Sequence, residues 1–183
     1  MAKQALLVMD VQRVIVDRYP DPAYLPRLRE AIEAARADSV PVIYVTVGFR
    51  SGRPEISARN KMFGRLVGAP EMPGADQANE VHPDVAPEPG DTLVTKRRVS
   101  AFAGSDLDMV LRAGEIDHLV LTGIATSGVV LSTLRQAADL DFGLTVLSDA
   151  CLDNDPEVHR VLTEKVFPQQ ADVTTVTEWV AAH

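Results

Sequence analysis

Short apolar runs rich in Val, Ile and Leu recur along the chain, separated by longer segments with a helical repeat. The runs lie at residues 5–9, 41–47, 92–95, 118–122, 144–147 and 173–176. Nearly continuous apolar character over such short stretches is typical of strands that are buried on both faces, as in a parallel sheet. The pattern therefore predicts a sheet of parallel strands.

Several of the intervening segments carry apolar residues at the spacing of an α-helix. They are residues 23–36, 105–113, 128–140 and 156–167. Ser105 is placed to cap the second of these helices, and Asp155, which precedes a proline, is placed to cap the last. Strands and helices that alternate in this way predict an α/β fold, with an open doubly wound sheet and helices on both faces. Residues 1–183 are expected to form a single domain.

The connection at residues 48–90 interrupts this alternation and is rich in proline and glycine. A connection of this length usually forms a functional lid or carries small helices of its own. We expect one such helix at residues 56–66.

Composition and charge narrow the class of protein. The chain has 46% hydrophobic residues and a net charge of −8, from 18 Lys and Arg against 26 Asp and Glu. An acidic chain without a basic stripe is not expected to bind nucleic acid or anionic membranes. A single cysteine, Cys151, excludes an internal disulfide. Neither a signal peptide nor an apolar run of about 20 residues is evident, so a cytoplasmic location is expected.

Candidate chemistry lies where the predicted strands end, because ligands of open α/β sheets bind beyond the carboxyl ends of the strands. Asp10 follows the first strand, and Lys96 ends the third. A buried carboxylate is costly unless it is paired, and Lys96 is its natural counterion. A structural ion pair, or a helix cap formed by Asp10, is the alternative. The turn at residues 123–128 could present backbone N–H groups to an anion.

The histidines give no indication of a metal site. His82, His118, His159 and His183 are scattered, without the close spacing of metal ligands. His82 is expected in a loop and His159 on a solvated helix face. We therefore expect neither a metal nor a cofactor.

Motifs in a specific order resemble the isochorismatase-like (cysteine hydrolase) superfamily over essentially the whole chain. They are Asp-x-Gln at 10–12, Lys96 with Ser-Ala-Phe-x-Gly-Ser at 100–105, Leu-Thr-Gly-Ile-Ala-Thr-Ser-Gly at 121–128, and Ser-Asp-Ala at 148–150. The resemblance implies a Rossmann-like three-layer sandwich, with strand order 3-2-1-4-5-6, and hydrolysis of a small molecule.

The resemblance also assigns roles to individual residues. It places the catalytic Asp at Asp10, the catalytic Lys at Lys96, a cis peptide at Ile124–Ala125, and an oxyanion hole at the N–H groups of Ala125 and residue 129. The family's nucleophilic cysteine falls on Val129, which cannot form a thioester. The metal motif of nicotinamidases falls on residues 46–50, which contain no histidine. The candidate residues of the substrate pocket are Gln12, Phe49, Arg50, Arg98, Phe102, Thr126 and Ser127.

Neither Cys151 nor Ser127 is expected to replace the missing nucleophile. In the implied strand order the fifth strand lies two strands from the first, which is roughly 10 Å at about 4.8 Å per strand. A thiol cannot reach that far, so Cys151 is interpreted as a small buried apolar residue. Ser127 has no histidine in its own motif to activate it.

We weigh three hypotheses for the function. The first is a hydrolase that uses Asp10 as a general acid toward a vinyl ether or a similar bond, without a covalent intermediate. Its difficulty is that Lys96 should lower the pKa of Asp10, whereas a general acid needs a raised pKa. The second is a non-catalytic binding or scaffold protein. The third is an amidase in which Asp10 activates water.

The partners are expected to be a small substrate and further copies of the chain. Arg50, Arg53, Arg97 and Arg98 lie in segments where they could bind a carboxylate, although solvated arginines are the alternative. The resemblance implies a homodimer or a larger homo-oligomer, formed through the helix after Gly128 and the connection at 48–90.

Overall fold

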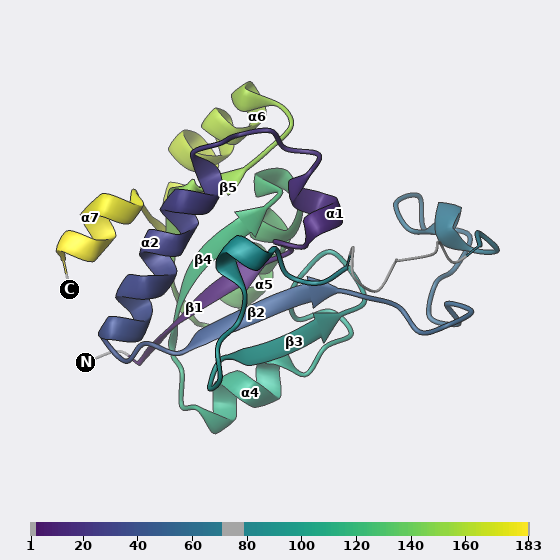
Figure 1. The fold of residues 1–183 in the computed structure, drawn as a ribbon, viewed down its shortest axis with the longest axis horizontal. Helices are drawn as coiled ribbons and strands as arrows, with labels where there is room; N and C mark the ends of the chain where they lie inside the picture. The colour runs from purple at the N-terminus through teal and green to yellow at the C-terminus, as the bar shows by residue number, and fades with distance from the viewer. Residues whose placement is uncertain (1–2, 71–78, 183) are drawn as a thin grey trace.

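The computed structural model describes residues 3–70 and 79–182. The strands form an all-parallel six-stranded sheet in the order β3-β2-β1-β4-β5-β6, which confirms the predicted topology (Figure 1). The strands are β1 (Gln4–Met9), β2 (Val42–Val47), β3 (Thr92–Lys96), β4 (His118–Ile124), β5 (Gly143–Leu152) and β6 (Asp172–Thr174).

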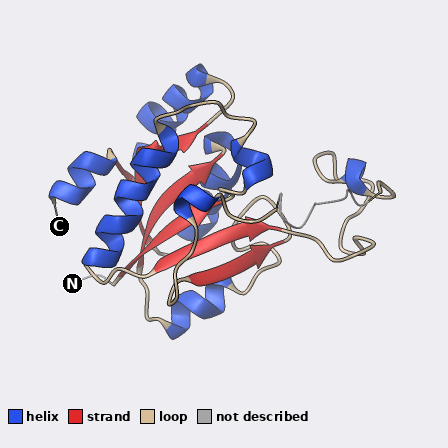
Figure 2. Cartoon of the chain, in the orientation of Figure 1, coloured by secondary structure: helices blue, strands red, loops and turns tan. Residues whose placement is uncertain are grey.

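Two hydrophobic cores lie on opposite faces of this sheet, which explains why the strands are apolar at nearly every position. Leu7 and Met9 of β1 belong to one core, with α4 (Leu107–Ala113) and α5 (Leu131–Asp139). Leu6 and Val8 belong to the other core, with α2 (Tyr24–Ala37) and α7 (Val176–Ala181). Successive side chains of a strand point to opposite faces, so a strand covered on both faces has no polar side. Figure 2 shows the resulting three layers.

The predicted helices are present, with corrections at their ends. Asp155 caps α6 (Pro156–Val161) by accepting from the N–H groups of Glu157 and Val158, as expected. The residue at the cap position of α4 is Asp106, one residue later than expected, although the Ser105 hydroxyl accepts from the N–H of Leu107 and donates to the carbonyl of Ala101. The predicted helix at 128–140 is preceded by a π-helical turn, η3 (Thr126–Val130). After α6 the chain continues as η4 (Leu162–Val166) and η5 (Phe167–Gln169).

The connection between β2 and β3 contains less helix than predicted. The expected helix at 56–66 is wrong, since only a short 3₁₀ turn, η1 (Gly64–Leu66), forms there. Asn60 is one reason: its side-chain oxygen accepts from the N–H groups of Met62 and Phe63 and so favours a local turn. Residues 71–78 of this connection lie outside the described residues. His82 lies in a loop, as expected, and precedes η2 (Pro83–Val85).

Residues 48–70, which we call the arm, leave the end of β2 and extend away from the sheet (Figure 1). A short helix that the periodicity did not predict, α1 (Arg13–Val16), follows β1. The arm and α1 both start at the carboxyl ends of their strands, so both are placed to border a site there. Within the described residues, no helix has the length and apolar character needed to cross a membrane.

Candidate active site

Asp10 and Lys96 form a buried ion pair at the carboxyl edge of the sheet. Lys96 Nζ lies 2.9 Å from Asp10 Oδ2, although β3 and β1 are separated by β2. The long lysine side chain spans that strand, and its Nζ also donates to the carbonyl of Arg98. Both residues are almost fully buried, at 1% exposure for Lys96 and 7% for Asp10. The predicted proximity of the two charges is confirmed.

Asp10 is held in an environment that favours its protonated form. Burial raises its pKa from 3.8 to about 6, and this effect outweighs the opposing attraction of Lys96. Asp10 Oδ1 is buried without a hydrogen-bond partner among the described residues. The backbone at Asp10 has a φ of 57°, a conformation that few non-glycine residues adopt. One oxygen of the carboxyl group therefore pairs with Lys96, and the other is buried without a hydrogen-bond partner among the described residues.

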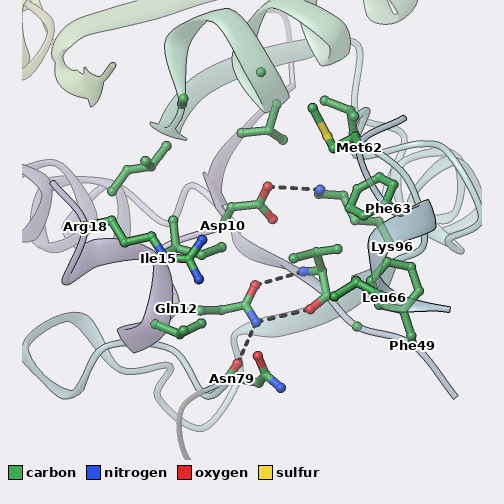
Figure 3. A pocket seen from close by; sticks show the side chains of 18 of the residues that line it. Asp10, Gln12, Ile15, Arg18, Phe49, Met62, Phe63, Leu66, Asn79 and Lys96 are labelled. Carbon is green, nitrogen blue, oxygen red and sulfur yellow. Dashed lines mark hydrogen bonds and ion pairs between the residues drawn. The ribbon is translucent and has the colours of Figure 1, made fainter. Parts of the chain in front are cut away.

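A cavity of about 870 Å³ opens on this pair (Figure 3). Its wall includes the Asp10–Lys96 pair, α1, the arm and the β4–α5 turn. Figure 3 shows Gln12, Ile15 and Arg18 on one side of Asp10, and Met62 and Phe63 on the other. Residues near the N-terminus thus form one side of the cavity, and residues of the arm form the other side.

The β4–α5 turn contributes backbone to the cavity. The peptide bond Ile124–Ala125 is cis, as the resemblance led us to expect. Ile124, Ala125, Gly128 and Val129 all line the cavity. Val129, which the sequence resemblance assigns to the position of the family's cysteine, is 2% exposed and packs in the core. The residues that line the cavity from this turn, Ile124, Ala125, Gly128 and Val129, offer no nucleophilic side chain.

Only some of the predicted pocket residues line the cavity. Phe49 and Arg50 do, and Phe49 packs edge-on against Phe63, with ring centroids 5.3 Å apart. Gln12 also lines it, but its side-chain amide exchanges hydrogen bonds with the backbone of Val47 and donates to the carbonyl of Asn79. Gln12 thus joins the chain after β1 to the end of β2.

The remaining predicted pocket residues are placed elsewhere. Arg98 donates to the carbonyls of Glu55 and Arg97, and Phe102 packs against Phe142. Neither residue is part of the cavity wall. Arg97 likewise donates to the carbonyl of Gly48 and pairs with Glu55, so it ties the arm to β3. The contacts of Arg97 and Arg98 with the arm depend on the path of the arm, and the apolar pattern of the sequence does not indicate that path.

Thr126 and Ser127 also lie outside the cavity wall, on the far side of the turn. Thr126 is fully buried, and its hydroxyl lies 2.8 Å from Nδ1 of His159. The N–H group of Ser127 donates to Asp153. The expectation that His159 lies on a solvated helix face is therefore wrong: the ring is partly buried against Thr126, and burial lowers its pKa.

Cys151 is inert in its setting. It is 2% exposed on β5, opposite Gly123 in the sheet, and burial raises the pKa of its thiol to about 12. It is absent from the cavity wall. The interpretation of Cys151 as a small buried residue agrees with this environment.

Two arginines in the cavity wall were not predicted from the sequence. Arg18 follows α1 and Arg65 lies in the arm. Among the described residues, the cavity wall carries the cationic side chains Arg18, Arg50, Arg53, Arg65 and Lys96 and one acidic side chain, Asp10. Arg53 is engaged with the carbonyls of Leu66 and Ala69. In a chain of net charge −8 this local excess of positive charge favours an anionic ligand.

Comparison with known proteins agrees with this architecture. Residues 4–178 match the family described as the isochorismatase domain, and the chain therefore belongs to that family. Members of this family include amidohydrolases and cysteine hydrolases. The chain thus belongs to an α/β family whose members include hydrolases.

Individual relatives can be named. Ureidoacrylate amidohydrolase RutB of Stutzerimonas stutzeri is 33% identical over 207 residues, which cover 99% of this chain and 80% of that protein. An isochorismatase family protein from Burkholderia thailandensis superposes with a TM-score of 0.86 at 28% identity, over 98% of this chain and 95% of the other. N-carbamoylsarcosine amidase from Thermoplasma acidophilum has a TM-score of 0.75 at 29% identity, over 95% and 96% of the two chains.

Proposed function

We propose that this protein hydrolyses a small carboxylate-bearing molecule, with Asp10 as the proton donor and without a covalent enzyme intermediate. One observation carries the proposal: a buried carboxyl group with a pKa of about 6, one of whose oxygens has no hydrogen-bond partner among the described residues, belongs to the wall of a cavity. A general acid works best when its pKa lies near the working pH. The assignment of Val129 to the position of the family's cysteine supports hydrolysis without a covalent intermediate.

In the proposed reaction, protonated Asp10 transfers its proton to the double bond of a vinyl ether. Water then adds to the resulting cation, and one of its protons returns to Asp10. The other proton moves from the new hydroxyl group to the ether oxygen as that carbon–oxygen bond breaks, which releases a carbonyl compound and an alcohol. Lys96, 2.9 Å from Asp10 Oδ2, stabilises the carboxylate that forms when the proton leaves. Lys96 thus opposes protonation of Asp10 in the resting enzyme but favours the transfer of that proton to the substrate.

Arg18 is the side chain we assign to the substrate's carboxylate. It lines the cavity near Asp10, and no ion pair is recorded for it among the described residues (Figure 3). Its guanidinium can bind a carboxylate through two parallel hydrogen bonds. The other cationic side chains of the cavity wall also attract the negatively charged carboxylate of the substrate.

Hydrolysis of an amide or urea is the second candidate. The relatives named ureidoacrylate amidohydrolase and N-carbamoylsarcosine amidase favour it. Ionised Asp10 would then act as a base that activates water. The two candidates require opposite protonation states of the same carboxyl group, so they predict opposite pH dependence.

The experiment is a screen of vinyl ethers, amides and ureas bearing a carboxylate, followed by Asp10→Asn on any substrate found. Asn is nearly isosteric, so ligand binding should survive while turnover falls about 10²- to 10⁴-fold. Asp17→Asn, an exposed change just after α1, is the matched control and should leave turnover unchanged. Equal turnover in Asp10→Asn would refute the mechanism. Binding without turnover in the wild type would instead favour a scaffold protein.

A further inference from the structure

The β4–α5 turn is attached on its outer side to the segment that leads into α6. The buried hydroxyl of Thr126 shares a 2.8 Å hydrogen bond with Nδ1 of His159 on α6. The next residue, Ser127, donates its N–H to Asp153 Oδ2 at 2.7 Å. Asp153 follows β5 and precedes α6, so both bonds tie the turn to the same neighbouring segment.

The opposite side of this turn faces the cavity. Ala125 directly precedes Thr126, and Gly128 and Val129 follow it within the same turn. All three line the cavity near the Asp10–Lys96 pair, whereas Thr126 and His159 do not. A displacement of Thr126 would therefore move backbone that borders the reacting groups.

The Thr126–His159 pair is not a nucleophile with its base. A hydroxyl next to a histidine is the arrangement that activates serine or threonine for attack. However, Thr126 is fully buried and lies outside the cavity wall, so its hydroxyl does not reach a bound molecule. The bond can act on the reaction only through the backbone of the turn.

We propose that His159 is a positioning residue, which holds the cavity side of residues 124–129 in place through its hydrogen bond to Thr126. The bond replaces water at a buried hydroxyl, which would otherwise be left unpaired. The predicted effect of this hydrogen bond on turnover rests on the proposed function, whereas its predicted effect on the order of the turn does not. The two can therefore be tested separately.

The kinetic test compares His159→Leu with His159→Asn on a substrate found in the screen. Leu removes the bond, and a backbone misplaced by about 1 Å can cost up to about 100-fold in rate, so kcat should fall about 10- to 100-fold with KM little changed. The side-chain amide of Asn can occupy the place of Nδ1, so His159→Asn should recover most of kcat. Asp155→Ala weakens the cap of α6 but leaves the Thr126–His159 bond, and it should retain kcat.

A double-mutant cycle assigns the effect to the bond. Thr126→Val should lower kcat by about as much as His159→Leu, and the double variant should be no worse than either single variant. Additive losses would show that His159 acts through another contact and would overturn the proposal. Loss of kcat in His159→Asn and Asp155→Ala alike would indicate a general structural role and would also overturn it.

Hydrogen exchange tests the proposal without a substrate. The amides of Ser127, Gly128 and Val130 form hydrogen bonds in or beside the turn. Their exchange should accelerate about 3- to 10-fold in His159→Leu and remain near wild type in His159→Asn. Unchanged exchange in His159→Leu would overturn the positioning role, even if Asp10→Asn abolishes turnover. Accelerated exchange in a protein without turnover would retain it and reject only the proposed function.

Discussion

Gly123 of β4 lies against the carbonyl oxygen of Met9 so closely that a Cβ on Gly123 would be 2.1 Å from that oxygen. Its φ of +136° also favours glycine. Met9 directly precedes Asp10, and the two strands pair at this point. The position of Asp10 thus depends on the absence of a side chain on the neighbouring strand.

Gly123→Ala is expected to lower the free energy of unfolding by more than about 1 kcal/mol, because the methyl group meets backbone and the conformation is strained. Gly90→Ala is the control, since its φ of +108° is also unusual but no atom lies within 4 Å of the added carbon. Urea denaturation of both variants separates the two effects. Equal destabilisation would mean that the contact with Met9 is unimportant.

The pH dependence of kcat/KM should follow Asp10. The proton is present below the pKa of about 6, so a general acid predicts constant kcat/KM below pH 6 and about a tenfold fall for each pH unit above it. An Asp10-activated water predicts the reverse, with kcat/KM rising to a plateau above pH 6. Residual activity of Asp10→Asn should lose this dependence. A profile that is flat from pH 5 to 8 would remove Asp10 from the rate-limiting step.

Thiol reagents should not inhibit the wild-type protein. Cys151 is buried and its pKa of about 12 keeps the thiol protonated, so iodoacetamide should not react with it at pH 8. Val129→Cys places a thiol in the cavity wall and should be alkylated much faster, as followed by mass spectrometry. Loss of activity in a folded Cys151→Ala variant would contradict this prediction.

Arg18→Gln should weaken binding of a carboxylate substrate. Loss of a charge-assisted contact is expected to raise KM about tenfold or more, with kcat little changed. Arg13→Gln, an exposed change in α1 outside the cavity wall, is the matched control. The methyl ester of the same substrate should be insensitive to Arg18→Gln. Equal effects on the acid and the ester would show that Arg18 does not bind the carboxylate.

The sheet and the Asp10–Lys96 pair could be predicted because both follow from local rules. Apolar runs mark the strands, and a buried carboxylate at a strand end requires a cation. The pKa of Asp10 could not be predicted, because it depends on a balance between burial and Lys96 that requires coordinates. The environment of His159 could not be predicted either, because its contact with Thr126 depends on how α6 packs against the β4–α5 turn, which no periodic pattern in the sequence indicates.

The arm was the least predictable part of the site. Its conformation depends on side chains that bond to backbone carbonyls, as Arg53 does to Leu66 and Ala69. Such contacts leave no periodic pattern in the sequence. Arg65 and Phe63 therefore reach the cavity wall without a signal that would mark them as pocket residues.

The two halves of the cavity wall have different origins in the chain. Asp10 and Lys96 belong to the ends of the strands, whereas Phe49, Phe63 and Leu66 all come from the arm. The arm is closed on itself by Arg53 and fastened to the body through Glu55. A change confined to this one stretch would therefore alter the shape of the cavity and leave the Asp10–Lys96 pair in place. Grafting the arm of a relative onto this sheet is the corresponding route to a hydrolase of altered selectivity.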